Sequence, residues 1–538
     1  MVSKPSAAPG RKAVYRYGYR RSRDQDARAA VRHPVIVVGA GPVGLTAAID
    51  LALRGVPVVL LDDADRIGEG SRGICWSKRT LEIFDRLGVG ERLVAQGVTW
   101  KLGKVFLGGE QVYSFDLLPE DGHKMPAFIN LQQYAVEKEL VERAGEIDGI
   151  DLRWKNKVTA VERRNDAVRL TVETPDGAYT LDADWLIAAD GARSSIRALL
   201  GLDFSGVTFE DKFLIADIRM AADLPTERRF WFDPPFHFGQ SALMHRQPSN
   251  VWRIDLQLGR DADAQEEQRP ENVIARLKRM LGEREFSLEW VSLYRFNCCR
   301  LERFVHGRIV FAGDSAHQVS PFGARGANSG VQDAENLSWK LAAVLNGEAG
   351  EGLIENYETE RAQAADENIA HSTRSTDFIA PRSAAERRLR NAVLHLAPQA
   401  EFARRMVNSG RLSVASVYDT PLSTPDEAAF KGSAKLGAPV PDAVMRTRAG
   451  ENKFLLEQLS GGFELIHVKN GARPDAPEGI KLTTIGEDLH DAEGMFMQRF
   501  DATPGATYLL RPDQHLAARW RNFDAAKVSA ARARILAP

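Results

Sequence analysis

Short apolar runs that end at glycines and lead into helical patterns recur along the chain. Residues 35–38 form the first apolar run, and residues 58–61 form the second. Between them, apolar residues recur at helical spacing over 45–54, and Gly55 ends that helix. Because strands that alternate with helices are typical of a parallel sheet, this pattern predicts a strand–helix–strand unit of an α/β fold.

Two later apolar runs end on an acidic residue beside a glycine. One run ends on Asp190 and Gly191, and the other, 309–312, ends on Gly313 and Asp314. A glycine-rich loop and an amphipathic helix follow the second run. The first turn of a helix has unpaired N–H groups and a partial positive charge, so the loop suits an anion or an electron-rich ring. The alternative is an ordinary strand–helix connection.

The middle of the chain has the alternating pattern of antiparallel strands. Alternation predicts strands over 152–154, 158–163, 168–174 and 179–181, with Gly177 in a hairpin turn, and an apolar run predicts a separate buried strand over 185–189. From 204 to 299 the strands are rich in aromatic residues, and one helix, 269–281, interrupts them. This pattern predicts a mixed sheet domain inserted between two halves of the first α/β domain.

The C-terminal residues predict a separate small α/β unit. Its expected elements are a helix over 454–459, strands over 463–467, 481–485, 507–510 and 516–519, and a helix over 525–536. The whole predicted division is a basic N-terminal arm (1–33), the first part of the α/β domain (34–203), the inserted sheet (204–299), the second part (300–410), a linker (411–439) and the C-terminal unit (440–538).

Composition excludes several classes of function. A net charge of −2 over 538 residues gives no electrostatic reason to expect a nucleic-acid partner. The cysteines, at positions 75, 298 and 299, have neither Cys-x-x-Cys nor metal-ligand spacing, so we expect no metal and a reducing cytoplasm. No apolar run reaches the ~18 residues of a membrane helix.

The first 33 residues carry nine basic against two acidic side chains, without the apolar region of a targeting peptide. We therefore expect an arm that lies on the body or on a partner subunit.

The first strand–helix–strand unit carries the glycine pattern of a dinucleotide site. Gly39 permits the tight turn, Gly41 allows a pyrophosphate to approach the backbone, and Gly44 allows close packing of helix and strand. Asp62 ends the second strand, eighteen residues beyond Gly44, where a carboxylate would bind a ribose. Strand, helix, second strand and acid in this order predict a dinucleotide-binding site.

Three motifs together resemble a known family. Gly39-x-Gly41-x-x-Gly44, Asp190-Gly191-x-x-Ser194-x-x-Arg197 and Gly313-Asp314 occur in the order seen in class A flavoprotein aromatic hydroxylases, of which p-hydroxybenzoate hydroxylase is an example. The resemblance covers about residues 33–400. The loop from Pro321 and the cysteine-free C-terminal unit are similar to the phenol hydroxylase and 3-(3-hydroxyphenyl)propionate hydroxylase branch. In that branch the tail resembles a thioredoxin fold that lacks the redox cysteines.

The resemblance implies FAD as the cofactor and assigns its contacts. The expected cofactor-binding residues are Gly39, Gly41 and Gly44 at the pyrophosphate, Asp62 at the ribose, Arg72 and Gln133 (or Gln132) at the flavin nucleotide, Asp190 with Arg197 in its loop, Gly313 and Asp314 at the ribityl chain, and Pro321, Gly326 and Asn328 along the isoalloxazine ring. Cys75 stands where relatives often have glycine, so the resemblance does not fix how closely that loop approaches the ring.

The family's chemistry implies the reaction and its partners. NADH or NADPH reduces the flavin, O2 adds at C4a, and the resulting hydroperoxide transfers a hydroxyl group to a phenolic aromatic ring. Asp190 would also serve the nicotinamide coenzyme, which lacks a second glycine fingerprint and would bind transiently. The resemblance further implies a homodimer.

Residues that activate the substrate are expected in the inserted sheet. A phenol reacts faster as its phenolate, so a base or a proton relay should meet its hydroxyl group. His237, His245 and Arg246 are the candidate catalytic residues, and Arg246 and Arg253 could also anchor a substrate carboxylate.

Other functions fit parts of the same pattern. An epoxidase or a hydroxylase of polyketide-type polycyclic phenols would use the same scaffold. A FAD-binding protein without turnover would purify yellow but would not oxidise NAD(P)H in response to phenols. A dehydrogenase that uses nicotinamide alone would purify colourless, and the motifs at Asp190 and Asp314 argue against it.

Overall fold

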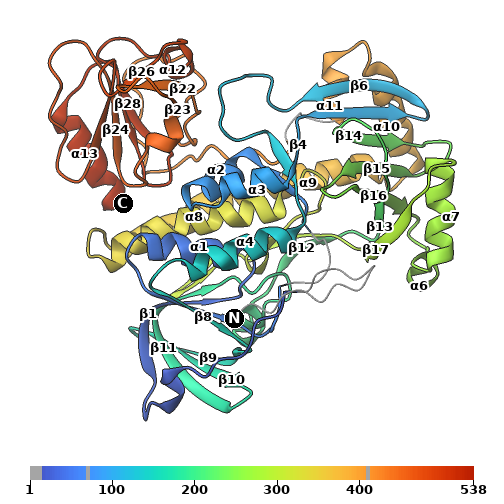
Figure 1. The fold of residues 1–538 in the computed structure, drawn as a ribbon, viewed down its shortest axis with the longest axis horizontal. Helices are drawn as coiled ribbons and strands as arrows, with labels where there is room; N and C mark the ends of the chain where they lie inside the picture. The colour runs from blue at the N-terminus through green and yellow to red at the C-terminus, as the bar shows by residue number, and fades with distance from the viewer. Residues whose placement is uncertain (1–14, 68–72, 408–411, 538) are drawn as a thin grey trace.

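A computed structural model describes residues 15–67, 73–407 and 412–537. Figure 1 shows the long helix α8 (Gly326–Leu345) crossing the middle of the molecule. The N-terminal sheet lies below α8, the aromatic-rich sheet lies at the upper right, and the C-terminal unit lies at the upper left. Three sets of elements that are separate in sequence therefore surround α8 and α9 (Gly352–Ile379).

A parallel sheet forms the base of the N-terminal part. Its strands run in the order β8-β2-β1-β11-β20, all parallel. Their bounds are β1 (Val31–Val38), β2 (Val58–Asp62), β8 (Ile150–Trp154), β11 (Gly177–Ala188) and β20 (Ile309–Phe311). Helices α1 (Pro42–Leu53), α4 (Gln133–Gly145) and α8 pack against it through one core. The predicted strand–helix–strand unit is confirmed.

One strand differs from the expectation for this region. The pattern predicts two strands, over 179–181 and 185–189, whereas the structure has the single strand β11. Asp182 and Asp184 lie toward solvent between buried residues, so the alternation continues through them. The first half of β11 pairs with β10 (Val168–Thr174) and β9 (Lys157–Arg163), and the second half lies in the parallel sheet.

A second sheet, here called the aromatic sheet, contains most of the predicted inserted strands. Its order is β17 (Ser287–Tyr294), β13 (Lys212–Arg219), β16 (Val251–Leu258), β15 (Ser241–Arg246), β14 (Arg228–Phe232), β5 (Leu102–Leu107) and β6 (Glu110–Asp116). The β5–β6 hairpin comes from the earlier part of the chain. Helix α7 (Pro270–Leu281), predicted over 269–281, covers one face of this sheet.

The opposite face, here called the inner face, packs on other helices. Apolar residues of β13, β14 and β15 join one core with α9, α10 (Ala384–Leu396) and α11 (Glu401–Val407). The same core includes Phe322, whose ring lies 4.8 Å from that of Phe213 and 5.4 Å from that of Phe296. The glycine-rich loop before α8 is therefore in contact with the inner face.

Short strands connect these parts. Strands β3 (Cys75–Ser77), β7 (Phe128–Asn130) and β4 (Val98–Trp100) form one small sheet; β12 (Ser205–Thr208), β18 (Asn297–Arg300) and β21 (His317–Gln318) form another. The remaining connecting elements are α2 (Lys78–Arg86), α3 (Gly90–Gln96), α5 (Ser195–Leu199), α6 (Ala264–Glu267) and β19 (Val305–His306).

The C-terminal unit has its own mixed sheet. The order is β23 (Asn452–Phe454), β22 (Val444–Thr447), β26 (Leu489–His490), β25 (Lys481–Ile485), β24 (Glu464–Val468), β27 (Thr507–Leu510) and β28 (Leu516–Trp520), with α12 (Met495–Phe500) and α13 (Ala525–Leu536). The helix predicted over 454–459 is present as a short 3-10 helix, Leu455–Gln458. It follows β23 directly, and its start is held by two hydrogen bonds, from the Leu455 N–H to the Ala443 carbonyl and from the Phe454 N–H to Glu457.

The described part of the basic arm lies on the parallel-sheet domain. The Tyr17 ring stacks on Trp154 at the end of β8, with centroids 4.7 Å apart. The Tyr17 N–H donates to the Asp65 carbonyl, just beyond the end of β2. Among the described helices, none combines the length and the apolar character needed to cross a bilayer.

Candidate active site

The glycine loop after β1 leaves room for a ligand at the first turn of α1. Gly39 has φ +105°, and a Cβ there would lie 2.4 Å from the Ala189 carbonyl oxygen. A Cβ at Gly44 would lie 1.9 Å from the Gly39 carbonyl oxygen. At Gly41, the N-cap of α1, a Cβ would meet no atom within 4 Å. Two glycines thus close the turn, and the third faces open space beside the N–H groups of a helix, which suits a pyrophosphate.

Asp62 joins the end of β2 to this loop. One carboxylate oxygen accepts the Ala40 N–H at 2.7 Å, and the other accepts the Ala64 N–H at 2.8 Å. Burial raises the pKa of Asp62, while these two backbone bonds favour its charged form. Each oxygen keeps a second lone pair that a ribose hydroxyl could use.

Asp190 lies at the neighbouring strand end and has an oxygen available. Its Oδ2 accepts hydrogen bonds from the Ser195 hydroxyl at 3.1 Å and from the Ile196 N–H at 3.0 Å. Its Oδ1 is buried, and the described residues provide no hydrogen-bond partner for it. A buried oxygen without a partner is costly, which indicates a ligand at this position.

Arg197 holds the two acid–glycine motifs together. Its guanidinium donates to the Ala192 carbonyl at 2.8 Å and to the Ser315 carbonyl at 3.0 Å. The guanidinium also lies 4.2 Å from the centroid of the Phe204 ring. The loops that follow β11 and β20 are therefore fixed relative to each other, although they are more than a hundred residues apart.

The turn at Gly313 lies between α1 and α8. Gly313 has φ +67°, and a Cβ there would lie 2.9 Å from the side chain of Val43 in α1. A Cβ at Gly330 in α8 would lie 3.0 Å from the Gly313 Cα. The Gly313 N–H donates to Asp333 Oδ2 at 2.8 Å. The position of Asp314 thus depends on close packing that a larger side chain would disrupt.

Asp333 is a site-supporting residue that sequence reasoning missed. Besides Gly313, it accepts hydrogen bonds from His317 at 2.6 Å and from Arg361 at 2.5 Å. Burial alone would raise its pKa, but His317 and Arg361 lower it. In the sequence Asp333 is one of many polar residues of the helix after the glycine loop, and nothing there shows that it lies inward.

The glycine-rich loop reaches α8 through left-handed backbone at Gly323 (φ +114°) and Ala324 (φ +54°). The amide of Asn328 then donates to the Cys75 carbonyl at 2.9 Å and accepts the Ser77 N–H at 2.9 Å. The Asn328 side chain thus joins the start of α8 to β3. Pro321 lies at the beginning of the loop, and Gly326 is the first residue of α8.

The remaining predicted cofactor contacts are Gln133, Gln132 and Arg72. Gln133 begins α4, accepts the Gly73 N–H at 3.1 Å and donates to Glu137 at 2.7 Å. Gln132 is the buried N-cap of that helix. Arg72 lies outside the described residues. Arg79, a second arginine near this loop, is turned away toward Glu335 of α8, at 2.8 Å.

These observations fit a flavin dinucleotide. The open space at Gly41, the unpaired buried oxygen of Asp190 and the first turn of α8 all lie at the carboxyl edge of the parallel sheet, where open α/β sheets bind ligands. FAD would supply the redox and oxygen chemistry at this edge. The chain would contribute N–H donors for the phosphates, carboxylates for hydroxyl groups and the helix N-terminus for the ring.

Polar residues cross the inner face of the aromatic sheet above this edge. Strand pairing places His245 opposite Arg253, and Arg253 opposite Asp217. The guanidinium of Arg253 donates to both oxygens of Asp217, at 2.9 and 3.1 Å. Arg228 lies one residue before the pair Arg229–Met244, so it stands next to His245 on this face.

His245 is the predicted catalytic residue that the structure places on the inner face. It is buried, and its ring lies 5.9 Å from Trp100 in an edge contact. Burial lowers the pKa of His245 well below its usual value, and the nearby charges of Arg228 and Arg253 lower it further. The imidazole is therefore neutral at physiological pH.

The other two predicted catalytic residues lie elsewhere. His237 bonds the Gln257 carbonyl at 2.6 Å and lines a cavity of about 380 Å³ beside α7. Arg246 lies over the Trp252 ring and lines a cavity of about 360 Å³ near β4. The structure thus brings His245 and Arg253 together on the inner face and does not bring His237 and Arg246 there.

The inner face also carries polar residues that sequence reasoning missed. Arg228, Tyr113 and Asp255 lie on β14, β6 and β16. Their signal in the sequence is the alternation of polar and apolar residues within strands that are otherwise buried, as in Arg253, Asp255 and Gln257 of β16. A polar residue at every second position of a buried strand indicates a polar face.

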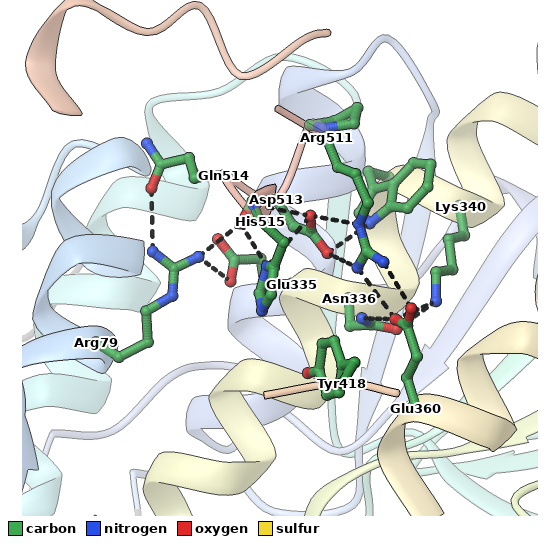
Figure 2. Close-up of polar contacts among 12 residues, drawn as sticks. Arg79, Glu335, Asn336, Lys340, Glu360, Tyr418, Arg511, Asp513, Gln514 and His515 are labelled. Atoms are coloured by element: carbon green, nitrogen blue, oxygen red, sulfur yellow. Dashed lines mark hydrogen bonds and ion pairs between the residues drawn. The ribbon is translucent and has the colours of Figure 1, made fainter. Parts of the chain in front are cut away.

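A buried ionic cluster connects α8 and α9 to the C-terminal unit (Figure 2). Arg511 donates to Glu360, which also accepts a hydrogen bond from Lys340 at 2.8 Å. Asp513, bonded to Arg511, accepts the Trp339 N–H at 3.0 Å. In Figure 2, Arg79 lies on the other side of α8 and reaches Glu335 and Gln514.

Comparisons with known proteins agree with this geometry. The model of the FAD binding domain family matches residues 32–372. A flavin-dependent monooxygenase of Mycobacteroides abscessus is 29% identical over 90% of this chain and 96% of its own. A 3-(3-hydroxy-phenyl)propionate/3-hydroxycinnamic acid hydroxylase of Mycolicibacterium gilvum is 27% identical over 90% of this chain and 88% of its own.

A solved structure shows the same fold over nearly the whole chain. The flavin-dependent monooxygenase PieE, in complex with FAD and substrate, superposes with a TM-score of 0.79 at 24% identity. The match covers 94% of this chain and 100% of PieE. The predicted family is therefore confirmed. The chain belongs to the FAD binding domain family, among the FAD-dependent monooxygenases that resemble p-hydroxybenzoate hydroxylase.

Proposed function

We propose that this flavin-dependent monooxygenase hydroxylates a phenolic aromatic substrate, with NADH or NADPH as reductant and O2 as oxidant. The observation that supports this most is the contact between the glycine-rich loop and the inner face of the aromatic sheet. Phe322 of the loop packs on Phe213 and Phe296, so the expected position of the flavin ring lies under an aromatic surface.

The chain's own residues have three roles in this site. Aromatic side chains of the inner face exclude water and accommodate a flat ring. The neutral imidazole of His245 can form a hydrogen bond with a phenol hydroxyl, because its buried Nδ1 has no partner among the described residues. The first turn of α8 favours the negative charge that a reduced flavin carries, by about 1 kcal/mol.

Two further expectations belong to the same proposal. The C-terminal unit would be thioredoxin-like, which is supported by a central strand β24 between parallel β25 and antiparallel β27. Residues 440–538 contain no cysteine, so this unit would have no thiol redox role. The assembly would be a homodimer, as the family resemblance implies.

The decisive experiment combines a spectrum with a substrate screen. The purified protein should show the visible absorption of FAD, and simple phenols should accelerate NADH or NADPH oxidation with formation of a product one oxygen heavier. Turnover of only bulky polycyclic phenols, or an epoxide product, would replace this proposal with the polyketide hydroxylase or epoxidase alternative. Bound FAD without phenol-dependent oxidation would indicate a binding protein.

A further inference from the structure

Arg228 of β14 is a buried cation that forms no ion pair or hydrogen bond with any other described residue. The residue is only 8% exposed. Within the described residues, it forms neither a hydrogen bond with an acceptor nor an ion pair with an acid. Arg253, on the same face, shows the usual arrangement, because Asp217 neutralises it at 2.9 Å. A buried charge without a partner is strongly unfavourable, so the position of Arg228 requires an explanation.

Three more polar groups around Arg228 are also unsatisfied. Tyr113 Oη, His245 Nδ1 and Asp255 Oδ1 are buried and have no hydrogen-bond partner in the described part of the chain. They come from different strands of the aromatic sheet, β6, β15 and β16. A single unsatisfied buried atom is common in folded proteins. Several on one face of a sheet indicate that a polar ligand forms hydrogen bonds with them.

Strand register places this group together on the inner face. Arg228 is adjacent to His245, Leu243 pairs with Asp255, and Val105 pairs with Tyr113. Burial lowers the pKa of Arg228, and the nearby Asp255 carboxylate opposes this shift. The four side chains therefore share one environment.

The surroundings of Arg228 lie next to the start of α8, where the flavin ring is expected. Burial raises the pKa of the Cys75 thiol and the nearby charge of Arg228 opposes this, so Arg228 lies close to Cys75. The Cys75 carbonyl accepts the amide N–H of Asn328. Cys75 and Trp100 both donate to the side-chain oxygen of Asn130, and Trp100 contacts the edge of His245. The unsatisfied polar groups thus lie on the side of the aromatic sheet that faces the start of α8.

We propose that Arg228 anchors an anionic oxygen of the substrate, so that the substrate is an aromatic compound bound as its carboxylate or phenolate. Tyr113, His245 and Asp255 would bond the remaining polar groups of the same ligand. A guanidinium pairs with a carboxylate or phenolate oxygen through charge-assisted hydrogen bonds, the strong class of such bonds. The inference deepens the proposed function and rests on it, because it names the charge of the substrate.

The test measures ligand binding to the FAD-loaded protein by calorimetry. The probes are 3-(3-hydroxyphenyl)propionate, its primary amide, which keeps the phenol, and 3-phenylpropionate, which keeps only the acid. We expect the wild-type protein to bind at least one anionic probe about tenfold or more tightly than its neutral counterpart. Binding is measured without NAD(P)H, so a failure of turnover would refute the proposed function without affecting this result.

The probes distinguish the two sources of negative charge. If the carboxylate is the anchor, both acids bind and the amide does not. If the phenolate is the anchor, the acid and the amide bind alike, 3-phenylpropionate does not, and affinity rises as the pH approaches the phenol pKa of about 10. Either pattern supports the proposal. Equal affinity for all three probes at every pH would overturn it.

Two variants assign the effect to Arg228. Arg228→Met should remove the preference for the anion, and Arg228→Lys should restore part of it. The matched control is Arg229→Met, because Arg229 is the next residue, points to the other face of the sheet and already pairs with Glu227. This control should keep the wild-type preference. An unchanged preference in Arg228→Met would refute the proposal.

Stability separates a ligand anchor from a structural arginine. Because no described residue pairs with Arg228, Arg228→Met should not lower the melting temperature measured without added ligand and is expected to raise it. The Lys variant, which keeps the charge, should not show that gain. A marked fall in melting temperature in Arg228→Met, together with a retained anion preference, would mean that the residue only supports the fold.

Discussion

Arg511, in the turn between β27 and β28, donates two hydrogen bonds to Glu360 of α9, at 2.6 and 3.0 Å, and both side chains are excluded from solvent. The attraction between them holds the pKa of Glu360 far below its usual value, against the opposing effect of burial. Neither charge could remain buried without the other. The C-terminal unit and the helices beside the cofactor site are therefore expected to unfold together.

Arg511→Met should destabilise the whole protein. The substitution leaves Glu360 with Lys340 and Asn336 only, and breaking a buried pair from one side costs about 3 to 5 kcal/mol. Urea unfolding, followed by fluorescence, would measure this loss. Lys527→Met is the control, because Lys527 pairs with Glu427 at the surface and should contribute less than about 1 kcal/mol. Equal effects of the two substitutions would contradict the prediction.

Asp314→Ala should weaken FAD binding with little change in folding. Its position at the strand end, held by the Gly313 turn, supports a contact with hydroxyl groups of the cofactor. Loss of a charge-assisted bond predicts a rise of tenfold or more in the dissociation constant for FAD. Fluorescence titration of the apoprotein with FAD measures it. Asp366→Ala, at an exposed pair with Arg300, should bind FAD normally.

Asp333→Asn should also weaken FAD binding, but indirectly. An amide can replace only some of the bonds to Gly313, His317 and Arg361, so the turn that carries Asp314 would shift. If Asp333 acts through this turn, the double variant with Asp314→Ala should lose no more FAD affinity than Asp314→Ala alone. Additive losses would show that Asp333 acts independently of Asp314.

The stability conferred by Asp255 should fall as the pH rises. Burial raises the pKa of Asp255 to about 6. The positive charge of Arg253 lowers this pKa, and the negative charge of Asp217 raises it further. Its folded pKa lies above its unfolded value, so its contribution is present below about pH 4 and is lost as the pH rises through about 6. Relative to Asp255→Asn, the wild-type protein should lose about 2 to 3 kcal/mol between pH 4 and pH 7. A constant difference in urea unfolding across this range would contradict the assignment.

The parts of the fold that were predictable from sequence are those that depend on local spacing. Four such positions directly follow an apolar run that forms a strand: the loop at Gly39, the strand ends at Asp62 and Asp190, and the turn at Gly313. Glycine and a terminal acid are informative because the backbone geometry itself requires them.

The interactions that could not be predicted join residues far apart in the chain. Arg511 and Glu360 are 151 residues apart, and His245 and Arg228 become neighbours only through strand pairing. A charged residue in a sequence is normally assigned to the surface, because burial is rare without a partner. The partner is visible only in the folded molecule, so neither the ionic cluster nor the proximity of Arg228 to His245 could be predicted.

The buried ionic cluster also limits how such proteins can exchange parts during evolution or in the laboratory. A chimera that took its C-terminal unit from a relative would have to inherit the matching partners of Arg511 and Asp513 from the same parent. Recombination at the irregular segment before β22 would separate Arg511 from Glu360 and Gln514 from Arg79. Crossovers there should yield soluble enzymes only between parents that share these charges.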